Sequence, residues 1–370
     1  MQIIIEALGI NRAGGGRSAT LNLLQSIKSI DRINHYTILL SAKESSLFSE
    51  AGKVKQVIVP INNRFLSRIW AQIYIPLISH RYDLVHFAKD LGVYAVRCPF
   101  IITIYDLAVL IYTNLYPATD VFYWKTIQKD TLKNSSRIIT LSKTTKNDIM
   151  KYYQIDPHKI EVIYNPIGSN FVRSTDKEIH KTKQKYGINH EYLLHVGRID
   201  VKKNLSFLVR LFDDLTKKYT KEIELVIVGE NYQKCQDTSL FQTIEELDLN
   251  EKVILTGKVP DEDLPNLYSG AKVAVFPSFY EGFGLTQIEA MACGTPVVSH
   301  KAGAVGEVAD DAAVIIPDLN KDAFIEAIIE LLDNQDFRNE MIYKGFTRAD
   351  KFKGKNAAER TINLYNEISK

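Results

Sequence analysis

Short apolar runs rich in valine and isoleucine alternate with stretches of helical spacing along the whole chain. The strands predicted in the first half are residues 2–8, 36–40, 54–60, 83–87, 100–104 and 137–141. Between them, apolar residues recur three or four positions apart, which predicts helices. The clearest are a helix that begins near Ser18 and one that contains Ile69, Ile73 and Leu77.

The second half of the chain repeats this plan. The strands predicted there are residues 192–196, 224–228, 252–255, 272–276, 296–299 and 313–316. Helices are expected to begin near Asn204, Asp261 and Asn320, because such side chains accept hydrogen bonds from the first free amides of a helix. Short strands that alternate with helices predict an α/β fold with parallel, doubly wound sheets and helices on both faces.

Length and composition indicate two domains. A chain of 370 residues with 45% apolar content is long enough for two cores. The turn-rich segment 164–170 is the predicted boundary between the two domains. We therefore expect an N-terminal Rossmann-like domain at 1–167, a C-terminal one at 168–352, and a terminal amphipathic helix within 353–370. Ligands of such sheets sit beyond the carboxyl ends of the strands, so a site is expected in a cleft between the domains.

The cysteines and the N-terminus indicate a cytoplasmic protein. Cys98, Cys235 and Cys293 are odd in number and far apart, so neither a disulfide framework nor a zinc site is expected. The N-terminus reaches Glu6 too soon for a signal peptide, and no run of about 18 apolar residues occurs. We expect a protein that neither crosses a membrane nor uses the usual export signal.

The net charge of +2 conceals an asymmetry between the halves. Residues 1–167 contain 20 Lys and Arg against 12 Asp and Glu, whereas the remainder contains 26 against 32. A basic half favours a polyanionic partner, either membrane headgroups or a nucleic acid, although an ordinary solvated surface has the same composition.

The most informative segment is the run from Glu281 to Glu289. An apolar strand and Pro277 precede it, glycines follow Glu281, and a helix is predicted to open near Leu285. Free amides and the positive end of the helix dipole make such a turn a site for anions. Glu281 is expected at the mouth of that site and Glu289 a turn or two behind it.

A second cluster, residues 195–204, follows the first strand of the second half. Arg198 offers a planar fork to phosphate oxygens, and Lys203 places a compact charge at a helix start. Either residue alone is typical of a surface ion pair. Together, after a strand end, they favour binding of a diphosphate.

The glycine triplet Gly14-Gly15-Gly16 follows the first strand and precedes a helix. Its backbone amides could bind a phosphate or a sugar. The alternative is a flexible loop that binds no ligand, which has the same sequence pattern. The chain has neither the dinucleotide fingerprint nor a P-loop, which disfavours NAD and ATP.

Several motifs in this order resemble the retaining glycosyltransferases of family 4. They are Gly197-Arg198 with Lys203-Asn204, the turn Leu255-Thr256-Gly257-Lys258-Val259-Pro260, the run Glu281-Gly282-Phe283-Gly284-Leu285 with its second glutamate Glu289, and Gly294-Thr295-Pro296-Val297-Val298. The resemblance implies a GT-B fold: two Rossmann-like domains across a cleft, with the terminal helix crossing back to the first domain.

The resemblance also implies roles for individual residues. Arg198 and Lys203 would grip the donor diphosphate, and Glu281 would contact the donor sugar. Amides of Phe283, Gly284 and Leu285 would hold sugar and phosphate.

Further donor contacts follow from the same resemblance. Glu289 would bind the ribose hydroxyls, and backbone near Gly257 and Val259 would contact the base. Gly15 and Gly16 would close over the diphosphate. No metal and no cofactor are expected, because fixed cations and amides can stabilise the departing diphosphate by themselves.

The first domain departs from the family pattern. Many relatives have a His-Asp pair where this chain reads Tyr105-Asp106, and a tyrosine cannot take the same proton role near neutral pH. Tyr105, Asp106 and His86 are therefore acceptor-side candidates only. His86 also fits a hydrogen-bonded core histidine.

The run from Arg64 to Arg81 mixes bases with large apolar side chains. It predicts either a membrane-surface helix or a helix packed on its own sheet.

Together these patterns predict a cytoplasmic enzyme, peripheral on the inner face of the cell membrane. It would transfer a sugar, with retention, from a UDP- or GDP-sugar to a hydroxyl of a lipid-linked saccharide, in cell-surface polysaccharide or glycoconjugate assembly. One rival is a glycoside hydrolase using Glu281 and Glu289, but if both lie on one helix, eight residues separate them by roughly 12 Å, too far for either hydrolytic geometry. The other is a nucleic-acid-binding protein, for which no motif is present.

Overall fold

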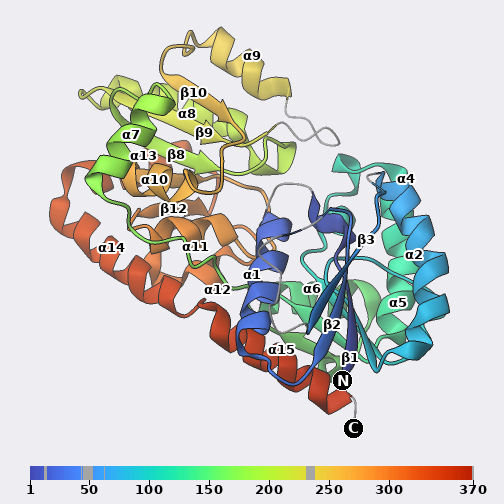
Figure 1. The fold of residues 1–370 in the computed structure, drawn as a ribbon. Helices are drawn as coiled ribbons and strands as arrows, with labels where there is room; N and C mark the ends of the chain where they lie inside the picture. Colours follow the sequence, from blue (N-terminus) through green and yellow to red (C-terminus); the bar gives the residue numbers. More distant parts are fainter. Residues whose placement is uncertain (12–14, 43, 45–52, 62, 231–237, 369–370) are drawn as a thin grey trace. The chain divides into compact units, whose positions relative to one another are not determined.

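The chain folds into two compact units in the computed structural model, which describes residues 1–11, 15–42, 44, 53–61, 63–230 and 238–368 (Figure 1). Unit 1 comprises Met1–Pro166 together with Lys353–Lys370, and unit 2 comprises Ile167–Phe352. The terminal helix therefore belongs to the same unit as the N-terminal sheet.

Unit 1 is built on a parallel sheet in the order β3-β2-β1-β4-β5-β6-β7. Its strands are β1 (Gln2–Glu6), β2 (His35–Leu40), β3 (Val54–Ile58), β4 (Leu84–Phe87), β5 (Phe100–Ile104), β6 (Arg137–Thr140) and β7 (Ile160–Val162). Its helices are α1 (Gly15–Ile30), α2 (Arg64–Ile78), α3 (Ala108–Ile111), α4 (Ala118–Tyr123), α5 (Lys129–Asn134), α6 (Lys143–Tyr153) and α15 (Gly354–Ile368).

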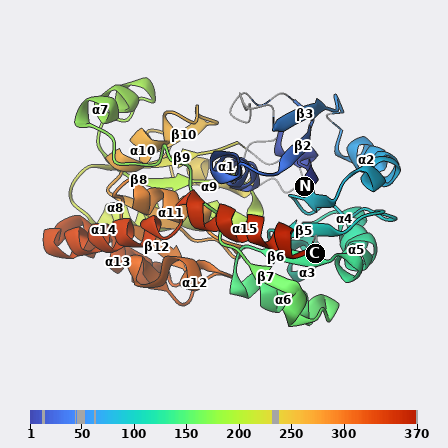
Figure 2. The same ribbon diagram turned by 60° about the horizontal axis from the view of Figure 1, so that its bottom comes forward.

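Both faces of this sheet are covered, which explains its nearly continuous apolar strands. Successive side chains of β1 point to opposite faces. Ile3 and Ile5 pack in one core with residues of α1 and α15, and Ile4 packs in another with residues of α2 and α6. Figure 2 shows α1 and α15 next to each other.

Unit 2 is built on a second parallel sheet in the order β10-β9-β8-β11-β12-β13. Its strands are β8 (Glu191–Val196), β9 (Ile223–Val228), β10 (Val253–Gly257), β11 (Val273–Phe276), β12 (Val297–His300) and β13 (Val314–Ile316). Its helices are α7 (Asp176–Lys185), α8 (Leu205–Lys218), α9 (Thr238–Glu246), α10 (Leu264–Gly270), α11 (Leu285–Ala292), α12 (Val305–Ala309), α13 (Lys321–Asp333) and α14 (Gln335–Asp350). Helices α8, α9 and α13 supply the core on one face, and α10 and α11 pack on the other.

Each sheet has a point where the strand order reverses. In unit 1 it lies between β1 and β4, and in unit 2 between β8 and β11. Doubly wound sheets bind their ligands beyond the carboxyl ends of the strands at such a point.

The predicted strands are confirmed with small shifts at their ends, but two helix starts were misplaced and one strand was not predicted. The first long helix begins at Gly15 rather than near Ser18, so two of the three glycines lie inside it. Helix α10 begins at Leu264, not at Asp261. The short strand β7 (Ile160–Val162) was not predicted.

Gly229 follows β9 in a backbone conformation (φ +149°) that other residues rarely adopt, and a Cβ there would overlap the carbonyl oxygen of Gly197. We predict that Gly229→Ala lowers the free energy of unfolding in urea by about 2–4 kcal/mol, through strain and overlap together. Gly187→Ala is the matched control: φ is +67°, but no atom of the residues that the structure describes lies within 4 Å of the added Cβ, so the cost is about 1–2 kcal/mol. Equal losses for the two variants would contradict this account.

Candidate active site

The candidate site lies at the reversal point of the unit 2 sheet. Lys203 ends a 3₁₀ turn (Val201–Lys203) that follows β8, and Glu281 lies in the loop between β11 and α11. These two loops leave neighbouring strands, so two residues 78 positions apart in sequence come together.

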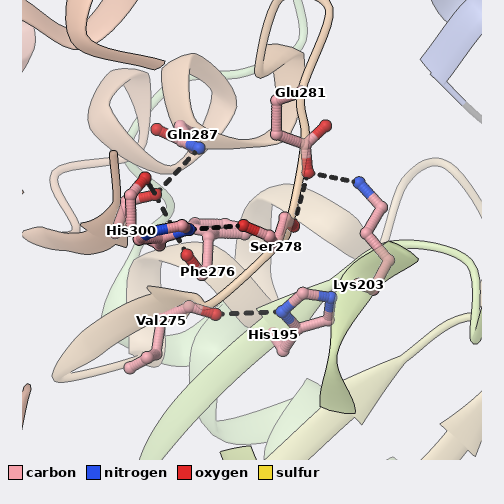
Figure 3. Close-up of polar contacts among 9 residues, drawn as sticks. His195, Lys203, Val275, Phe276, Ser278, Glu281, Gln287 and His300 are labelled. Carbon is pink, nitrogen blue, oxygen red and sulfur yellow. Dashed lines mark hydrogen bonds and ion pairs between the residues drawn. The ribbon is translucent and has the colours of Figure 1, made fainter. Parts of the chain in front are cut away.

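Lys203 and Glu281 form a largely buried ion pair. The Lys203 ammonium donates to Glu281 Oε1 at 2.6 Å, and the Ser278 hydroxyl donates to the same oxygen at 2.6 Å (Figure 3). Both donors contact the same carboxylate oxygen, Oε1. An ammonium group has three donors, so Lys203 can hold Glu281 and still offer donors to a phosphate.

The environment of Glu281 keeps its carboxylate ionised. Burial by itself would raise the pKa, but the charges of Lys203 and Lys202 and the hydrogen bonds from Lys203 and Ser278 outweigh it and lower the pKa. Glu281 is therefore a fixed negative charge at neutral pH.

Backbone contacts hold the Glu281 loop against its neighbours. The Phe279 amide donates to the Lys202 carbonyl at 2.9 Å, and the Ala304 amide donates to the Glu281 carbonyl at 2.9 Å. Gly303 (φ +57°) lies so close to Glu281 that a Cβ would overlap its carbonyl oxygen. The position of the carboxylate is thus fixed from both sides.

Arg198 belongs to the same group of charges. The charges of Lys203, Lys202 and Arg198 all act on the buried carboxyl of Asp200, whose pKa is nevertheless raised because burial is the largest effect. Asp200 Oδ1 is buried without a hydrogen-bond partner among the described residues. The predicted phosphate-binding cations Arg198 and Lys203 therefore lie in one electrostatic cluster with Glu281.

His195 lies beneath this cluster and was not predicted from the sequence. Its Nδ1 is 2.9 Å from the carbonyl oxygen of Val275, so Nδ1 is the donor and Nε2 the acceptor (Figure 3). Nε2 is buried and has no partner in the described part of the chain. Burial lowers the pKa of His195 to about 4, so the ring is neutral at pH 7 and adds no charge beside Lys203.

A further hydrogen-bond network supports the loop after β11. His300 Nδ1 is 2.9 Å from the Ser278 carbonyl, and the Gln287 amide donates to the Ser299 hydroxyl at 3.2 Å (Figure 3). Ser299 in turn donates to the Phe276 carbonyl at 3.1 Å. These residues hold the strand end from which the Glu281 loop departs.

The glycine turn after Glu281 leads into α11 as predicted. Gly284 is the N-cap residue at φ +90°, and it has no side chain to cap the helix. Phe283 and Leu285 on either side are buried, and Phe283 packs edge-on against Phe352. The backbone amides at this helix start are therefore held rigidly for an anion or a sugar.

Glu289 lies within α11 and has a different partner from Glu281. It accepts a hydrogen bond from the Tyr268 hydroxyl at 3.0 Å. Burial raises its pKa to about 8, so the carboxyl is largely protonated at neutral pH without a ligand. Glu281 precedes the helix, as expected, so the distance calculated for two glutamates on one helix does not apply to this pair.

The turn after β10 holds the remaining predicted donor residues. Gly257 adopts φ +67°, and its carbonyl accepts from the Gly229 amide at 3.0 Å. Val259 is buried. This turn follows β10, two strands from β8 across β9, at the same carboxyl edge of the sheet.

In unit 1, the predicted acceptor-side residues have structural partners. His86 is fully buried: Nδ1 is 2.6 Å from the Tyr365 hydroxyl and Nε2 is 2.8 Å from Thr103 Oγ1, and burial lowers its pKa to about 3. Tyr105 OH is 2.6 Å from Thr20 Oγ1, and Asp106 accepts from the Ala108 amide at 2.9 Å.

The glycines of unit 1 lie at the start of α1, and Gly14 falls outside the described residues. Among the described residues, no atom lies within 4 Å of a Cβ at Gly15, whereas a Cβ at Gly16 would be 3.0 Å from Lys89 Cε. Lys89 follows β4, so Gly16 lies at the reversal point of this sheet.

Glu6 ends β1 at the same point and was not predicted. Its Oε1 accepts from the Leu8 amide at 2.7 Å, while Oε2 is buried without a partner among the described residues. Burial raises its pKa to about 7. An isolated strand-end glutamate gives no signal of burial in the sequence.

The fold and this arrangement define a GT-B protein. A sequence model described as glycosyl transferases group 1 matches residues 176–348, and one described as glycosyltransferase family 4 matches residues 14–170. The chain belongs to the group 1 glycosyltransferases of the family 4 type.

Individual relatives agree with this assignment. O-antigen chain mannosyltransferase B of Escherichia coli is 29% identical over 71% of this chain and 69% of its own length. The Campylobacter jejuni N-acetylgalactosamine-N,N'-diacetylbacillosaminyl-diphospho-undecaprenol 4-alpha-N-acetylgalactosaminyltransferase is 29% identical over 58% of this chain and 56% of its own length. The structure of Anabaena HepE in complex with UDP-glucose superposes with a TM-score of 0.79 at 18% identity, covering all of both chains.

Among the described residues, no helix is both long and apolar enough to span a bilayer.

The raised pKa of Glu289 predicts a pH-dependent stability. Between its ordinary pKa of 4.5 and about 8, the folded state binds more protons than the unfolded state, so stability falls as pH rises through this window. We predict that wild-type Tm falls more between about pH 5 and pH 8 than the Tm of Glu289→Gln. Exposed Glu262→Gln is the control and should follow the wild type. Parallel curves for wild type and Glu289→Gln would refute the assignment.

Proposed function

We propose that this protein is a retaining, metal-independent glycosyltransferase that moves a hexosyl group from a UDP- or GDP-sugar to a hydroxyl of a lipid-linked saccharide. The observation that supports it best is the buried Lys203–Glu281 pair at the reversal point of the unit 2 sheet, with Arg198 in the same charge cluster. We further propose that it acts at the cytoplasmic face of the cell membrane, in assembly of a cell-surface polysaccharide or glycoconjugate.

The charges suit the departure of a nucleoside diphosphate. Breaking the bond from the anomeric carbon to the phosphate oxygen builds negative charge on the diphosphate. Arg198, Lys203 and the amides at the start of α11 are fixed donors for that charge, and one such donor contributes roughly 3 kcal/mol to stabilising the transition state. Glu281, held ionised, is suited to orient the sugar through its hydroxyls and to stabilise positive charge at the anomeric carbon.

We propose that the acceptor hydroxyl attacks the anomeric carbon on the same face of the sugar from which the leaving group departs. The acceptor oxygen forms a bond to the anomeric carbon as the phosphate oxygen leaves, and the hydroxyl proton passes to that phosphate oxygen. No proton then has to go to His195 or His86, both of which are neutral and buried.

The relatives indicate which substrates to test. One is named a mannosyltransferase of an O-antigen chain, and another is named for a diphospho-undecaprenol acceptor. A nucleotide-activated mannose is therefore the first donor, and a polyprenyl-diphosphate saccharide the first acceptor. The hydrolase alternative is not favoured, because Glu281 is paired with Lys203 and Glu289 with Tyr268.

We predict that the purified protein transfers sugar from one member of a panel of UDP- and GDP-sugars, without added metal and in the presence of EDTA. Proton NMR of the product should show the anomeric configuration of the donor. Inversion, or a requirement for metal, would contradict the corresponding part of the proposal. Absence of both transfer and slow donor hydrolysis would contradict glycosyl transfer itself.

We predict that Lys203→Ala and Arg198→Ala each lower kcat by about 10²–10³-fold, because each removes one donor to the departing diphosphate. The control is Lys218→Ala, which removes a lysine whose ion pair with Asp322 lies on the surface. Circular dichroism establishes that the variants are folded. An unchanged kcat in either site variant would rule out its role.

A further inference from the structure

Helix α2 (Arg64–Ile78) of unit 1 presents an apolar face to solvent. The exposed side chains are Phe65 (70%), Leu66 (53%), Ile69 (43%), Ile73 (61%) and Leu77 (58%), here called the α2 apolar face. Every exposed side chain that the structure describes on this helix is apolar. The usual surface helix shows the reverse pattern, with polar residues toward water.

Most of the exposed apolar side chains of α2 lie together on one face of the helix. Leu66, Ile69, Ile73 and Leu77 are three or four residues apart, which places them on one side of the helix. The opposite side, with Ala71 and Ile75, is fully buried in the unit 1 core. Of the fifteen large apolar residues exposed in the described part of the chain, five lie on this one helix, so the apolar surface is concentrated here.

The helix is firmly anchored. The Asn63 side chain accepts from the Phe65 and Leu66 amides and caps its start. The Gln72 side chain donates to the Gly92 carbonyl at 2.6 Å and accepts from the Tyr94 amide at 3.0 Å. The apolar face is therefore preformed, and binding a partner requires no ordering of the backbone.

A second anchor joins α2 to α4 (Ala118–Tyr123). The Arg68 guanidinium is 3.3 Å from the Asp120 carboxylate and 4.1 Å from the centre of the Tyr123 ring. Arg68 is thus turned toward the protein, and the described side chains on the outer side of α2 are apolar.

The surrounding sequence is basic. Residues 51–82 contain five Lys and Arg and no Asp or Glu. Lys55 on the edge strand β3 and Arg81 after the helix are both exposed. Trp70 and Tyr74, half-buried and stacked at 4.4 Å, are the aromatic types that favour the boundary between apolar and polar layers of a bilayer.

We propose that the α2 apolar face docks on the surface of an anionic lipid bilayer, with its apolar side chains among the acyl chains and the basic flanks at the headgroups. Apolar area and positive charge together are what an interfacial helix needs. A second copy of this chain fits less well, because two such surfaces would bring two acid-free, basic segments together. With fifteen residues, α2 is too short to cross a bilayer, which takes about twenty.

This inference rests on the proposed function in one respect, the lipid-linked acceptor. A protein that works on a membrane-anchored saccharide gains effective concentration when it is held at the same surface.

The test is vesicle binding by the full chain. Co-sedimentation compares vesicles of phosphatidylcholine alone with vesicles in which about a third of the lipid is phosphatidylglycerol. The variant is Leu66→Gln/Ile73→Gln/Leu77→Gln, since glutamine keeps the helix propensity and removes the apolar contact. The matched control is Ile33→Gln/Val172→Gln/Tyr343→Gln, which changes three side chains of similar exposure elsewhere.

The wild type and the control should bind anionic vesicles, and the α2 variant should bind at least about tenfold more weakly. Lys55→Gln/Arg81→Gln should lose the preference for anionic lipid and the sensitivity to salt. Brominated acyl chains should quench Trp70, whereas Trp124, the other tryptophan, is buried in the core.

Three outcomes would overturn the proposal. They are wild-type protein that does not bind anionic vesicles, an α2 variant that binds like the wild type, and a wild-type dimer that the α2 variant converts to monomer. Donor hydrolysis in solution separates this test from that of the proposed function. If the α2 variant loses vesicle binding but still hydrolyses the donor, the α2 apolar face serves membrane binding and not the reaction. If the wild type binds vesicles but neither hydrolyses the donor nor transfers sugar, the enzyme assignment is contradicted and the membrane proposal is not.

Discussion

The whole site depends on a pair of opposite charges held out of water. Lys203 and Glu281 meet at 2.6 Å, largely buried, where two neighbouring parallel strands end. A buried charge without its partner is strongly destabilising, by about 3–5 kcal/mol when one member is removed. The surrounding structure is arranged to prevent that, since Ser278 donates to the same carboxylate oxygen and the backbone of Gly303 approaches the Glu281 carbonyl.

The protein environment gives each titratable group near this pair a different state. Glu281 is ionised because cations and a hydroxyl outweigh its burial, whereas Glu289, with a tyrosine hydroxyl as its partner, has a pKa raised to about 8. His195 is neutral because it is buried against a carbonyl. The site therefore combines fixed charge at Lys203 and Glu281 with neutral groups around it, an arrangement suited to stabilising charge that develops on a bound diphosphate.

Much of this could be predicted from the sequence, and the omissions have physical reasons. Strand and helix alternation gave the two sheets, and Arg198, Lys203 and Glu281 follow strand ends, where parallel sheets bind ligands. His195 and Ser278 were missed because their importance comes from contacts with residues distant in the chain or from burial, neither of which has a sequence period. The start of α1 was misplaced because glycine is a poor helix former, yet Gly15 and Gly16 lie in its first turn. The composition of α2 left two interpretations open, a membrane-surface helix and a helix packed on its own sheet, since only the fold reveals which side faces water.

The most direct test of the central claim is a crystal structure of the protein with a bound nucleoside diphosphate. The account predicts that phosphate oxygens lie within hydrogen-bond distance of the Lys203 ammonium and the Arg198 guanidinium, beside the start of α11, with Glu281 still within reach of Lys203. A nucleotide bound elsewhere, or phosphates in contact with neither cation, would contradict it.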